Sequence, residues 1–428
     1  MPLPSATSHR PSPIGFAPPF IDEATIEAVE RVLRSGWITT GPETAAFEKE
    51  LAEFVGAPHV VCGGSWTGLA GVVLDWFGVG PGDEVILPAY TYCATANVVL
   101  HRGATPVLID LPQHGHRDGL NITWAQLAPL LSPRTKVVMP VDIGGWPVPC
   151  GSWKTALTHW VSKHGFQGDH PMQTALGRPL LLSDAAHSLG GRSDGHSVGA
   201  EADITVFSFH AVKNITTAEG GAAALTLPPP LDNAEVYRTL RSHCLHGQSK
   251  DAASKYNSKG KGQWRYDVTH PGFKCNMTDI QAAMGRVALK RYPADLQHRA
   301  QLAARYAERL SELSGLSAVD LPPRSDENRL TADHLFIIQL QEGMAAHRDA
   351  IIEALASQDI ATNVHFPPLP ALTAYRERGF KTADFPEAMR AFDRAISLPI
   401  HRHMSLGDVD RVVDALADAM TNLQDQAV

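Results

Sequence analysis

The sequence lacks the features that mark several large classes of protein. Its five cysteines are scattered without a CxxC pair, which argues against a disulfide framework and against a zinc site built on cysteine. No run of about 18 apolar residues occurs, and the first residues hold proline and serine where a signal peptide needs an apolar stretch. No long basic run occurs among 37 basic and 45 acidic residues. We therefore expect a cytoplasmic protein with small-molecule partners, without nucleic-acid or membrane partners and without a bound metal.

What the sequence does contain is an alternation of short apolar runs and helical patterns. Runs rich in Val, Ile and Leu are typical of buried strands, and the segments between them space their apolar residues at helical intervals. This order predicts an α/β fold with a mostly parallel central sheet covered by helices on both faces. The candidate strands are residues 59–64, 83–90, 105–111, 135–143, 179–186 and 203–210.

A second, smaller α/β unit is predicted from about residue 291. It contains a long amphipathic helix at 295–313, a strand at 333–340 and a C-terminal helix at 406–423. We expect a large domain over 22–290 and a small C-terminal domain over 291–428. The Lys-, Ser- and Gly-rich stretch 246–267 is interpreted as a loop within the large domain.

Two charged residues follow predicted strands, where ligands bind in parallel sheets. Lys213 lies in "SFHAVKNITTAEGG" (208–221), with no acidic residue within five positions. An amine near apolar groups becomes a nucleophile and a base, although a solvated loop lysine is the common alternative. Asp184 ends the run "LLLSD", where a buried carboxylate needs a partner unless it caps a helix.

The stretch "CGGSWTGLAG" (62–71) places Gly, Ser and Thr at the start of a helix, which suits a phosphate but also suits simple capping. Tyr92 in "PAYTYCATAN" offers an aromatic ring. An amine, a carboxylate, a phosphate cradle and an aromatic plate are together what pyridoxal phosphate (PLP) requires.

With these motifs in place, the chain resembles the DegT/DnrJ/EryC1/StrS family of PLP-dependent sugar aminotransferases, which have the type I (aspartate aminotransferase) fold. The resemblance runs from "SGWITTGP" (35–42) through "SDAAHSLGG", "SFHAVKNITTAEGG", "GFKCNMTDIQAAMG" and "VHFPPL" to "AISLPIHRHMSLGDVDRVVDAL" (395–416). It covers nearly the whole chain.

The resemblance implies a role for each matching residue. Lys213 binds the cofactor covalently, Asp184 pairs with the pyridine nitrogen, and His187 lies beside the phenolic oxygen unless it is a core histidine bonded to backbone. The remaining implied positions are Tyr92 on the ring, Thr67, Gly68 and Ser208 on the phosphate, Asn276 on the phosphate of a neighbouring subunit in a homodimer, and Gly36, Trp37, Thr39 and His365 in the substrate pocket.

Four departures from the family pattern qualify these roles. Trp66 replaces a glycine of the phosphate turn, which weakens the assignment of Gly68, and Lys274 competes with Asn276 for the phosphate contact. Pro370 stands where many relatives have a second histidine. Residues 150–179 form a longer segment than usual, interpreted as an inert surface insertion rather than a part of the substrate entrance.

The implied activity is transfer of an amino group from L-glutamate to a keto sugar, with a nucleotide-linked 4-keto-6-deoxyhexose as the expected acceptor. A cyclitol ketone such as scyllo-inosose is the main alternative. A PLP-dependent sugar dehydratase is disfavoured by Lys213, where such enzymes carry histidine, and a non-catalytic PLP-binding regulator is disfavoured by the presence of both Lys213 and Asp184. Specificity is expected to depend on loops such as 247–266.

Overall fold

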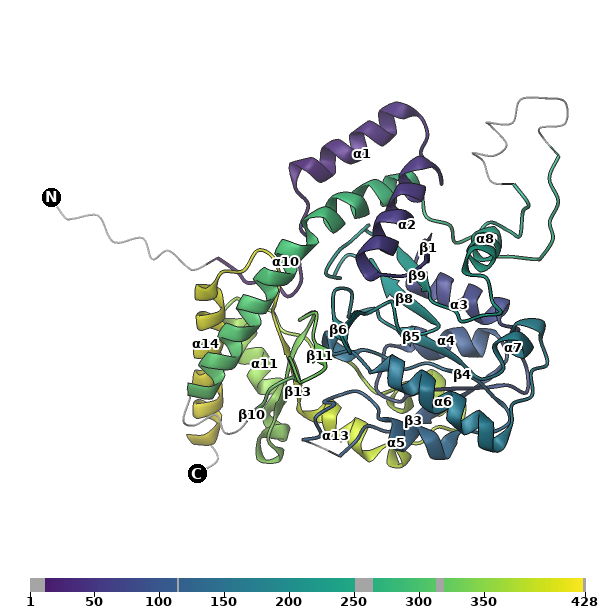
Figure 1. The fold of residues 1–428 in the computed structure, drawn as a ribbon. Coiled ribbons are helices and arrows are strands. Elements are labelled where there is room, and N and C mark those ends of the chain that lie inside the picture. Colours follow the sequence, from purple (N-terminus) through teal and green to yellow (C-terminus); the bar gives the residue numbers. More distant parts are fainter. Residues whose placement is uncertain (1–11, 114, 251–264, 313–318, 426–428) are drawn as a thin grey trace.

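The chain is divided between a larger part built on a seven-stranded sheet and a smaller C-terminal part (Figure 1). The computed structural model describes residues 12–113, 115–250, 265–312 and 319–425. One long helix, α10 (Asp279–Glu312), runs from the larger part into the smaller one. The predicted domain boundary at 290/291 falls inside this helix, so the division into two domains stays a prediction.

The central sheet is mostly parallel, as predicted. Strands β8, β5, β4, β2 and β3 lie parallel to one another, while β9 is antiparallel to its neighbours β1 and β8. In spatial order the strands are β1 (His59–Gly63), β9 (Gly221–Leu225), β8 (Ile204–Ser208), β5 (Leu180–Asp184), β4 (Thr135–Val138), β2 (Glu84–Pro88) and β3 (Thr105–Ile109). The short parallel strands therefore direct their carboxyl ends to one edge of the sheet.

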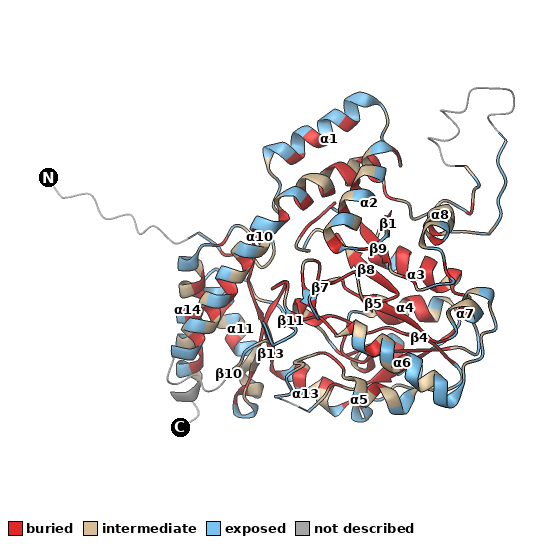
Figure 2. Ribbon diagram, in the orientation of Figure 1, coloured by how far each residue is buried: buried red, intermediate tan, exposed pale blue. Residues whose placement is uncertain are grey.

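Helices cover both faces of this sheet because alternate strand residues point to opposite sides. Leu180 and Leu182 of β5 join the core under α3 (Trp66–Trp76), α4 (Cys93–His101) and α8 (Asn233–His243). Leu181 joins a core on the other face, under α6 (Cys150–His164), and next to it α2 (Pro42–Val55) packs with the start of α10. Figure 2 shows the buried strands in the centre and exposed outer helix faces.

The smaller part has its own antiparallel sheet and hydrophobic core. Strands β10 (Val319–Asp320), β12 (Phe336–Leu340) and β13 (Ala395–Leu398) pair in that order, and the core lies between them and the helices α11 (Arg348–Ser357), α14 (Leu406–Asp425) and the end of α10. Other α-helices and strands that the structure describes are β6 (Arg192–Ser193), β7 (His196–Ser197), β11 (Arg329–Leu330), α1 (Glu23–Ser35), α5 (Trp124–Leu127), α7 (Pro171–Leu176), α12 (Thr373–Arg376) and α13 (Pro386–Arg394).

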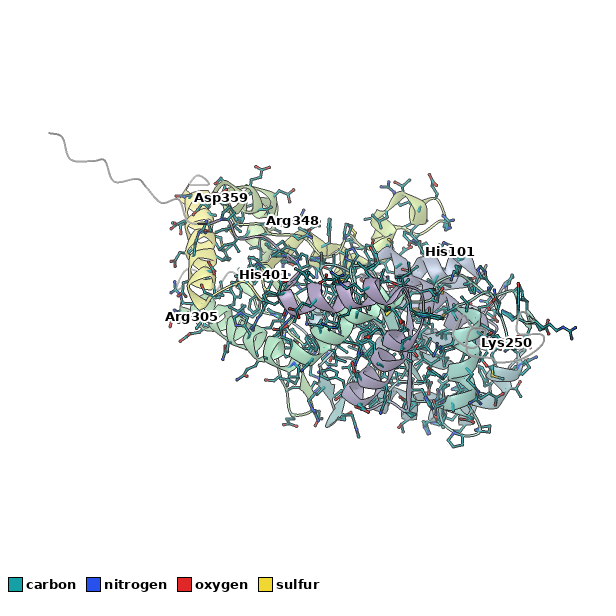
Figure 3. All side chains as sticks on the ribbon, turned by 90° about the horizontal axis from the view of Figure 1, so that it is seen from above. His101, Lys250, Arg305, Arg348, Asp359 and His401 are labelled. Atoms are coloured by element: carbon teal, nitrogen blue, oxygen red, sulfur yellow. The ribbon has the colours of Figure 1, made fainter. Side chains whose placement is uncertain are left out.

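An exposed ion-pair network joins α10 to α14. Arg305 and Arg309 both donate to Asp410, with nitrogen–oxygen distances of 2.8 and 3.1 Å, and Arg309 also reaches Asp414 at 2.5 Å. Figure 3 shows Arg305 in the smaller part and His101 at the other end of the molecule. This network lies on the surface of the smaller part.

The interpretation of 150–179 as an inert surface insertion is wrong for α6. Trp153 and Leu157 of that helix are buried against the sheet, so α6 is part of the fold. Gln173 of α7 is also buried and donates to the carbonyl oxygen of Phe77 at 3.0 Å. The segment is polar at its end but takes part in packing.

Two further expectations concern segments and membranes. Most of the loop predicted at 247–266, residues 251–264, lies outside the described residues. Within the described ranges, no helix has both the length and the apolar character needed to span a bilayer.

Candidate active site

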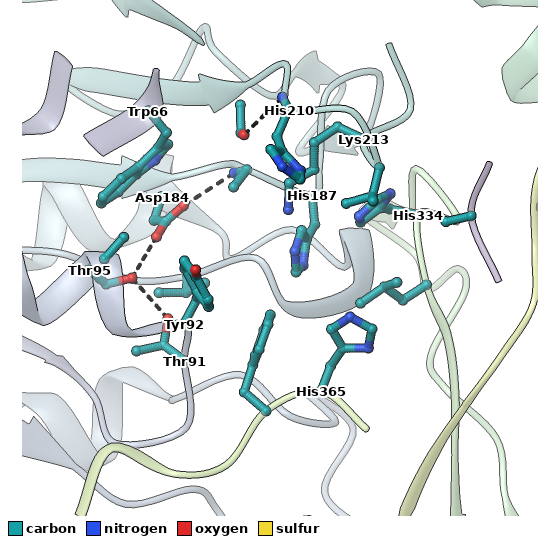
Figure 4. A pocket seen from close by; sticks show the side chains of 18 of the residues that line it. Trp66, Thr91, Tyr92, Thr95, Asp184, His187, His210, Lys213, His334 and His365 are labelled. Atoms are coloured by element: carbon teal, nitrogen blue, oxygen red, sulfur yellow. Dashed lines mark hydrogen bonds between the residues drawn. The ribbon is translucent and has the colours of Figure 1, made fainter. Parts of the chain in front are cut away.

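A cavity of about 460 Å³ lies at the carboxyl edge of the central sheet, where the smaller part meets the larger one. Seven of the predicted site residues line it: Thr67, Tyr92, Asp184, His187, Ser208, Lys213 and His365. They come from the ends of β5 and β8 or just beyond them, from the starts of α3 and α4, and, for His365, from the segment between α11 and α12 (Figure 4). The size is within the range for a small-molecule or cofactor site.

Lys213 enters this cavity from a tight turn after β8. Its N–H donates to the carbonyl oxygen of His210 at 2.9 Å, and Thr217 N–H reaches back to the carbonyl of Phe209 at 3.0 Å. Among the described residues, the Lys213 ammonium forms no ion pair within 4 Å. Burial lowers its pKa to about 8, although the charge of Asp184 acts in the opposite direction. Lys213 is therefore an amine that loses its proton close to neutral pH.

Asp184 ends β5 and is held by hydrogen bonds from neutral donors. Thr95 Oγ1 donates to one carboxylate oxygen at 2.9 Å, and the Ala186 N–H donates to the other at 3.2 Å. Burial raises the pKa of Asp184 to about 6, against the effects of these donors and of the charge of Lys213. Figure 4 shows the bond to Thr95 and the further contact from Thr95 to Thr91. The carboxylate is thus oriented by neutral donors, and no arginine of the described residues forms an ion pair with it.

The turn before α3 leaves backbone donors at the cavity wall. Ser65 caps the helix by accepting from Gly68 N–H at 3.0 Å, whereas the N–H groups of Trp66 and Thr67 have no partner inside the helix. The indole Nε1 of Trp66 is buried and has no hydrogen-bond partner among the described residues. Free donors at a helix N-terminus suit an anion.

Gly68, predicted beside Thr67, has a different surrounding. It is not among the cavity-lining residues. A side chain at this position would place its Cβ 2.9 Å from the Cβ of Cys275, so the close approach of Cys275 requires a glycine.

Four histidines line the cavity: the exposed His210 and the more deeply placed His187, His334 and His365. His187 Nδ1 accepts from Gly144 N–H at 3.3 Å, so its ring both lines the cavity and bonds to backbone, and its proton resides on Nε2. Its ring lies 4.6 Å from that of His334, whose Nδ1 contacts Asn214 Oδ1 at 2.7 Å. Burial lowers the pKa of both imidazoles well below the usual value, and the charge of Lys213 adds to this.

His365 is supplied by the C-terminal part of the chain. Its Nδ1 contacts Ser397 Oγ at 2.8 Å, and its carbonyl accepts a bond from the Tyr90 hydroxyl. Burial, followed by the charge of Lys213, lowers its pKa to about 4. The ring of Phe16 stacks on it at 5.4 Å, so the N-terminal stretch also contributes to the cavity.

Tyr92 is the N-cap residue of α4 and lies at the open side of the cavity, where 60% of its surface is exposed. Its ring is 5.9 Å from that of Phe366, in a tilted arrangement. Phe366 in turn stacks on His187 at 5.8 Å. An aromatic wall thus faces the charged groups.

The other predicted site residues lie away from this cavity. Asn276 Nδ2 donates to Thr40 Oγ1 at 2.6 Å, and Lys274 Nζ donates to Asn276 Oδ1 at 2.5 Å. Trp37 Nε1 donates to the carbonyl of Thr40 at 3.2 Å. Gly36, Trp37, Thr39 and Asn276 therefore form a second group, between α1, α2 and the start of α10, that does not reach Lys213 within one chain.

The cavity fits PLP by the chemistry of its donors. Within the described part of the chain, it combines an amine without an ion pair, a buried carboxylate, N–H groups that have no partner in α3, and the buried Trp66 Nε1 without a hydrogen-bond partner. The second glycine of the Lys213 motif is required for a steric reason, because a Cβ at Gly221 would lie 2.6 Å from the backbone nitrogen of Trp66. The lysine turn and the phosphate turn can pack together only with glycine there.

Several lining residues were not predicted from the sequence. His334, Arg299 and Phe16 have no motif of their own, whereas Phe366 stands beside His365 in "VHFPPL" but had no role assigned. All four reach the cavity from segments far from Lys213. Arg299 is buried and donates to the carbonyl of Ile400 at 3.0 Å, which explains its position as a structural link. Only the polar His334 at the start of a predicted strand gave a signal that could have been used.

Comparison with known proteins agrees with the site. The chain matches the DegT/DnrJ/EryC1/StrS aminotransferase family over residues 19–162 and 174–417. The interruption is thus confined to 163–173, from the end of α6 into the first turn of α7. The spore coat polysaccharide biosynthesis protein SpsC of Bacillus subtilis is 37% identical over 406 residues, which are 94% of this chain and 96% of that protein.

Solved structures give the same result. The putative sugar aminotransferase Spr1654 from Streptococcus pneumoniae, in its pyridoxamine phosphate (PMP) form, is 37% identical with a TM-score of 0.89, covering 97% of this chain and 100% of that one. Its PLP form has a TM-score of 0.88. Helicobacter pylori PseC, an aminotransferase involved in pseudaminic acid biosynthesis, is 27% identical with a TM-score of 0.81, covering 96% and 100%. The chain belongs to the DegT/DnrJ/EryC1/StrS family and is a PLP-dependent sugar aminotransferase with the type I fold.

Proposed function

We propose that this enzyme moves an amino group from L-glutamate to a nucleotide-linked 4-keto-6-deoxyhexose. The observation that carries the proposal is the pair formed by Lys213 and Asp184 in one cavity, each with a pKa shifted by burial and neither neutralised by a close ion pair among the described residues. Such a pair offers a base and a fixed negative charge at the same place.

The residues that would hold PLP are those predicted from the motifs. Asp184 would pair with the pyridine nitrogen, Tyr92 would cover the ring, and His187 would lie beside the phenolic oxygen. Ser208, Thr67 and the N–H groups of the α3 turn would bind the phosphate, whereas Gly68 would act only indirectly, by letting Cys275 pack against this turn. When bound, PLP supplies an electron sink that stabilises negative charge at the substrate's reacting carbon.

Lys213 would act as the acid and base of the transfer. With a pKa of about 8, its Nζ is partly neutral at pH 7 and can take the proton from Cα of the amino donor. Asp184 keeps its negative charge near the ring position, which favours a protonated nitrogen there. His187, His334 and His365 would be neutral, because the pKa of each is lowered, and Lys213 would carry the proton.

A keto sugar as acceptor is supported by the family and by neighbours described as sugar aminotransferases. The nucleotide, the 4-keto-6-deoxy ring and L-glutamate rest on the resemblance of the motifs. His365 would contact this substrate, together with Gly36, Trp37 and Thr39. The chain's cytoplasmic location stays a prediction.

We further propose that the working unit is a homodimer. Gly36, Trp37, Thr39 and Asn276 form a group outside the cavity, although the resemblance assigns them to substrate and phosphate. A second copy of the chain would bring this group to the cavity of the first. Lys274 lies beside Asn276 and would add positive charge near the phosphate.

The test is an absorbance spectrum of the purified protein with PLP, before and after addition of L-glutamate, followed by a panel of keto sugars. We expect the yellow band of lysine-bound cofactor in the wild type, its loss with glutamate, and its return with the accepted sugar. Lys213→Ala should show none of this, whereas Lys163→Ala, an exposed lysine at the end of α6, should behave as wild type. A band that glutamate leaves unchanged would exclude glutamate as donor, and return of the band only with a cyclitol ketone would exclude the proposed sugar.

A further inference from the structure

Outside the active site, two histidines and an aspartate meet at the far end of α3. Asp75 lies near the end of α3, His243 is the last residue of α8, and His270 belongs to the stretch 265–273. His270 Nε2 is 2.6 Å from Asp75 Oδ2, and His243 Nδ1 is 3.8 Å from the same oxygen. One nitrogen from each imidazole and the carboxylate oxygen all lie within 4.8 Å of one another.

The distances of 2.6 and 3.8 Å lie on either side of the distance expected between two ligand atoms of one metal ion. Zinc with nitrogen and oxygen bonds of about 2.0–2.2 Å in a tetrahedron places its ligand atoms about 3.3–3.5 Å apart. The His270–Asp75 pair must open slightly and the His243–Asp75 pair must close slightly to reach this value. Both are shifts of less than about 1 Å, within reach of side-chain rotation.

His243 provides an independent observation that points to a ligand at this place. Its Nδ1 is buried and has no hydrogen-bond partner among the described residues, and the residue is only 9% exposed. The nitrogen faces Asp75 Oδ2 at a distance too long for a hydrogen bond. A buried polar atom without a partner is costly, and a metal ion between His243 and Asp75 would satisfy it.

The surrounding groups leave the right atoms free. Arg102 Nη1 binds the other carboxylate oxygen, Asp75 Oδ1, at 2.8 Å, so Oδ2 remains directed toward the histidines. The two imidazole rings stack at 4.1 Å with an angle of 11° between their planes, so one ring must turn before both nitrogen lone pairs point at the same ion.

We propose that Asp75, His243 and His270 form a binding site for one divalent zinc ion, with water in the fourth position. Two imidazoles and one carboxylate are ligands suited to zinc and its neighbours among the transition metals, and unsuited to magnesium or calcium. The site is separate from the catalytic cavity, because Asp75 lies eight residues beyond Thr67, about 12 Å along α3. It does not depend on the proposed substrate.

Zinc at this site would join three segments of the fold. It would tie the end of α3 and the end of α8 to the stretch that leads from residue 265 into Cys275, whose carbonyl accepts from Gly64 N–H at 2.6 Å. Because an ion that binds only the folded protein stabilises it, the melting temperature should rise with zinc concentration.

The direct test uses the full-length, untagged holoenzyme, treated with a chelator and freed of it. Calorimetric titration with zinc chloride and elemental analysis after desalting should give one zinc per chain and no binding of magnesium. Cobalt in place of zinc should give the visible spectrum of nitrogen and oxygen ligands. Absence of saturable zinc binding by the wild type would overturn the proposal, as would a thiolate charge-transfer band, which would place the ion on the neighbouring cysteines Cys244 and Cys275.

Variants locate the ion without relying on activity. Asp75→Asn and His270→Ala should each weaken zinc affinity at least about tenfold and abolish the zinc-dependent rise in melting temperature. His101→Gln, which alters an exposed histidine at the end of α4, should bind zinc as the wild type does (Figure 3). Equal zinc affinity in the wild type and in both ligand variants would show that the ion binds elsewhere and would overturn the site.

Discussion

Strands β5 and β8 lie side by side, and an acidic and a basic residue lie close to both their amino ends (the amino edge of the sheet) and their carboxyl ends (the carboxyl edge). The two charges form a close ion pair at the amino edge but not at the carboxyl edge. At the amino edge, Arg178 and Asp203 form a buried bidentate pair with nitrogen–oxygen distances of 2.6 and 2.7 Å. At the carboxyl edge, Asp184 and Lys213 face the cavity, and no ion pair within 4 Å joins them in the part of the chain that the structure describes.

Within one pair of strands, the Arg178–Asp203 pair therefore serves stability, whereas Asp184 and Lys213 are available for chemistry. A bidentate pair fixes both side chains in one geometry and satisfies both charges. Groups kept apart under burial have their pKa values moved toward neutrality, to about 6 for Asp184 and about 8 for Lys213. The carboxyl edge thus keeps two titratable groups available where the amino edge holds a closed contact.

The largest effect is expected from removing the base of the carboxyl edge. Lys213→Ala should lower kcat for transamination by at least about 10⁴-fold, because it removes the amine that we propose to carry the proton. Steady-state assays with glutamate and the accepted sugar measure this. A loss below tenfold would mean that another group is the base.

Removing the acid of the same edge should have the next largest effect on rate. Asp184→Asn keeps the shape of the side chain and its contact with Thr95, but removes the negative charge, so kcat should fall on the order of 10²–10³-fold. PLP should still bind, as its absorbance will show. Unchanged kcat with normal PLP content would contradict the assigned role of Asp184.

At the amino edge, the same substitution should act on stability instead. Asp203→Asn leaves Arg178 buried without its charge partner, which should lower the free energy of unfolding by about 3–5 kcal/mol. Urea denaturation of both asparagine variants gives the comparison, with kcat per folded molecule as the control. If Asp203→Asn loses activity without losing stability, the contrast between the two edges is wrong.

The pH dependence of stability should report on the raised pKa of Asp184 at the carboxyl edge. The raised pKa of Asp184 means that its contribution to stability is present below pH 3.8 and is lost as pH rises through about 6. In the cofactor-free protein, the wild type should therefore lose about 3 kcal/mol relative to Asp184→Asn across this window. Denaturation of both proteins at several pH values measures the difference, and a pH-independent difference would contradict the raised pKa.

The smallest effect is expected far from both edges. Arg305→Ala removes an exposed ion pair between α10 and α14, so stability should fall only slightly, and the loss should vanish at high salt. Thermal melts at low and high ionic strength measure this, with Arg31→Ala on the exposed face of α1 as the control. A large loss that persists in high salt would mean that this network is as important as the Arg178–Asp203 pair.

The fold was accessible from the sequence because its elements are local. Apolar runs of strand length and helical spacing predicted every strand of the central sheet except β9, a run of alanines after glycine that lacks β-branched residues. The segment 150–179 was misjudged because its polar residues hid Trp153 and Leu157, whose burial depends on the sheet beneath α6.

The sequence by itself determined which residues follow the strand ends, since a parallel sheet brings those positions to one edge whatever the connections between them. That was sufficient to bring Lys213, Asp184, Ser208, Tyr92 and Thr67 together. Only the tertiary structure decided that Phe16, His334 and Phe366 complete the cavity, and that Asp75, His243 and His270 meet at the end of α3. Such contacts join segments whose separation in the chain carries no periodic signal, because packing of the whole fold, and not local pattern, sets them.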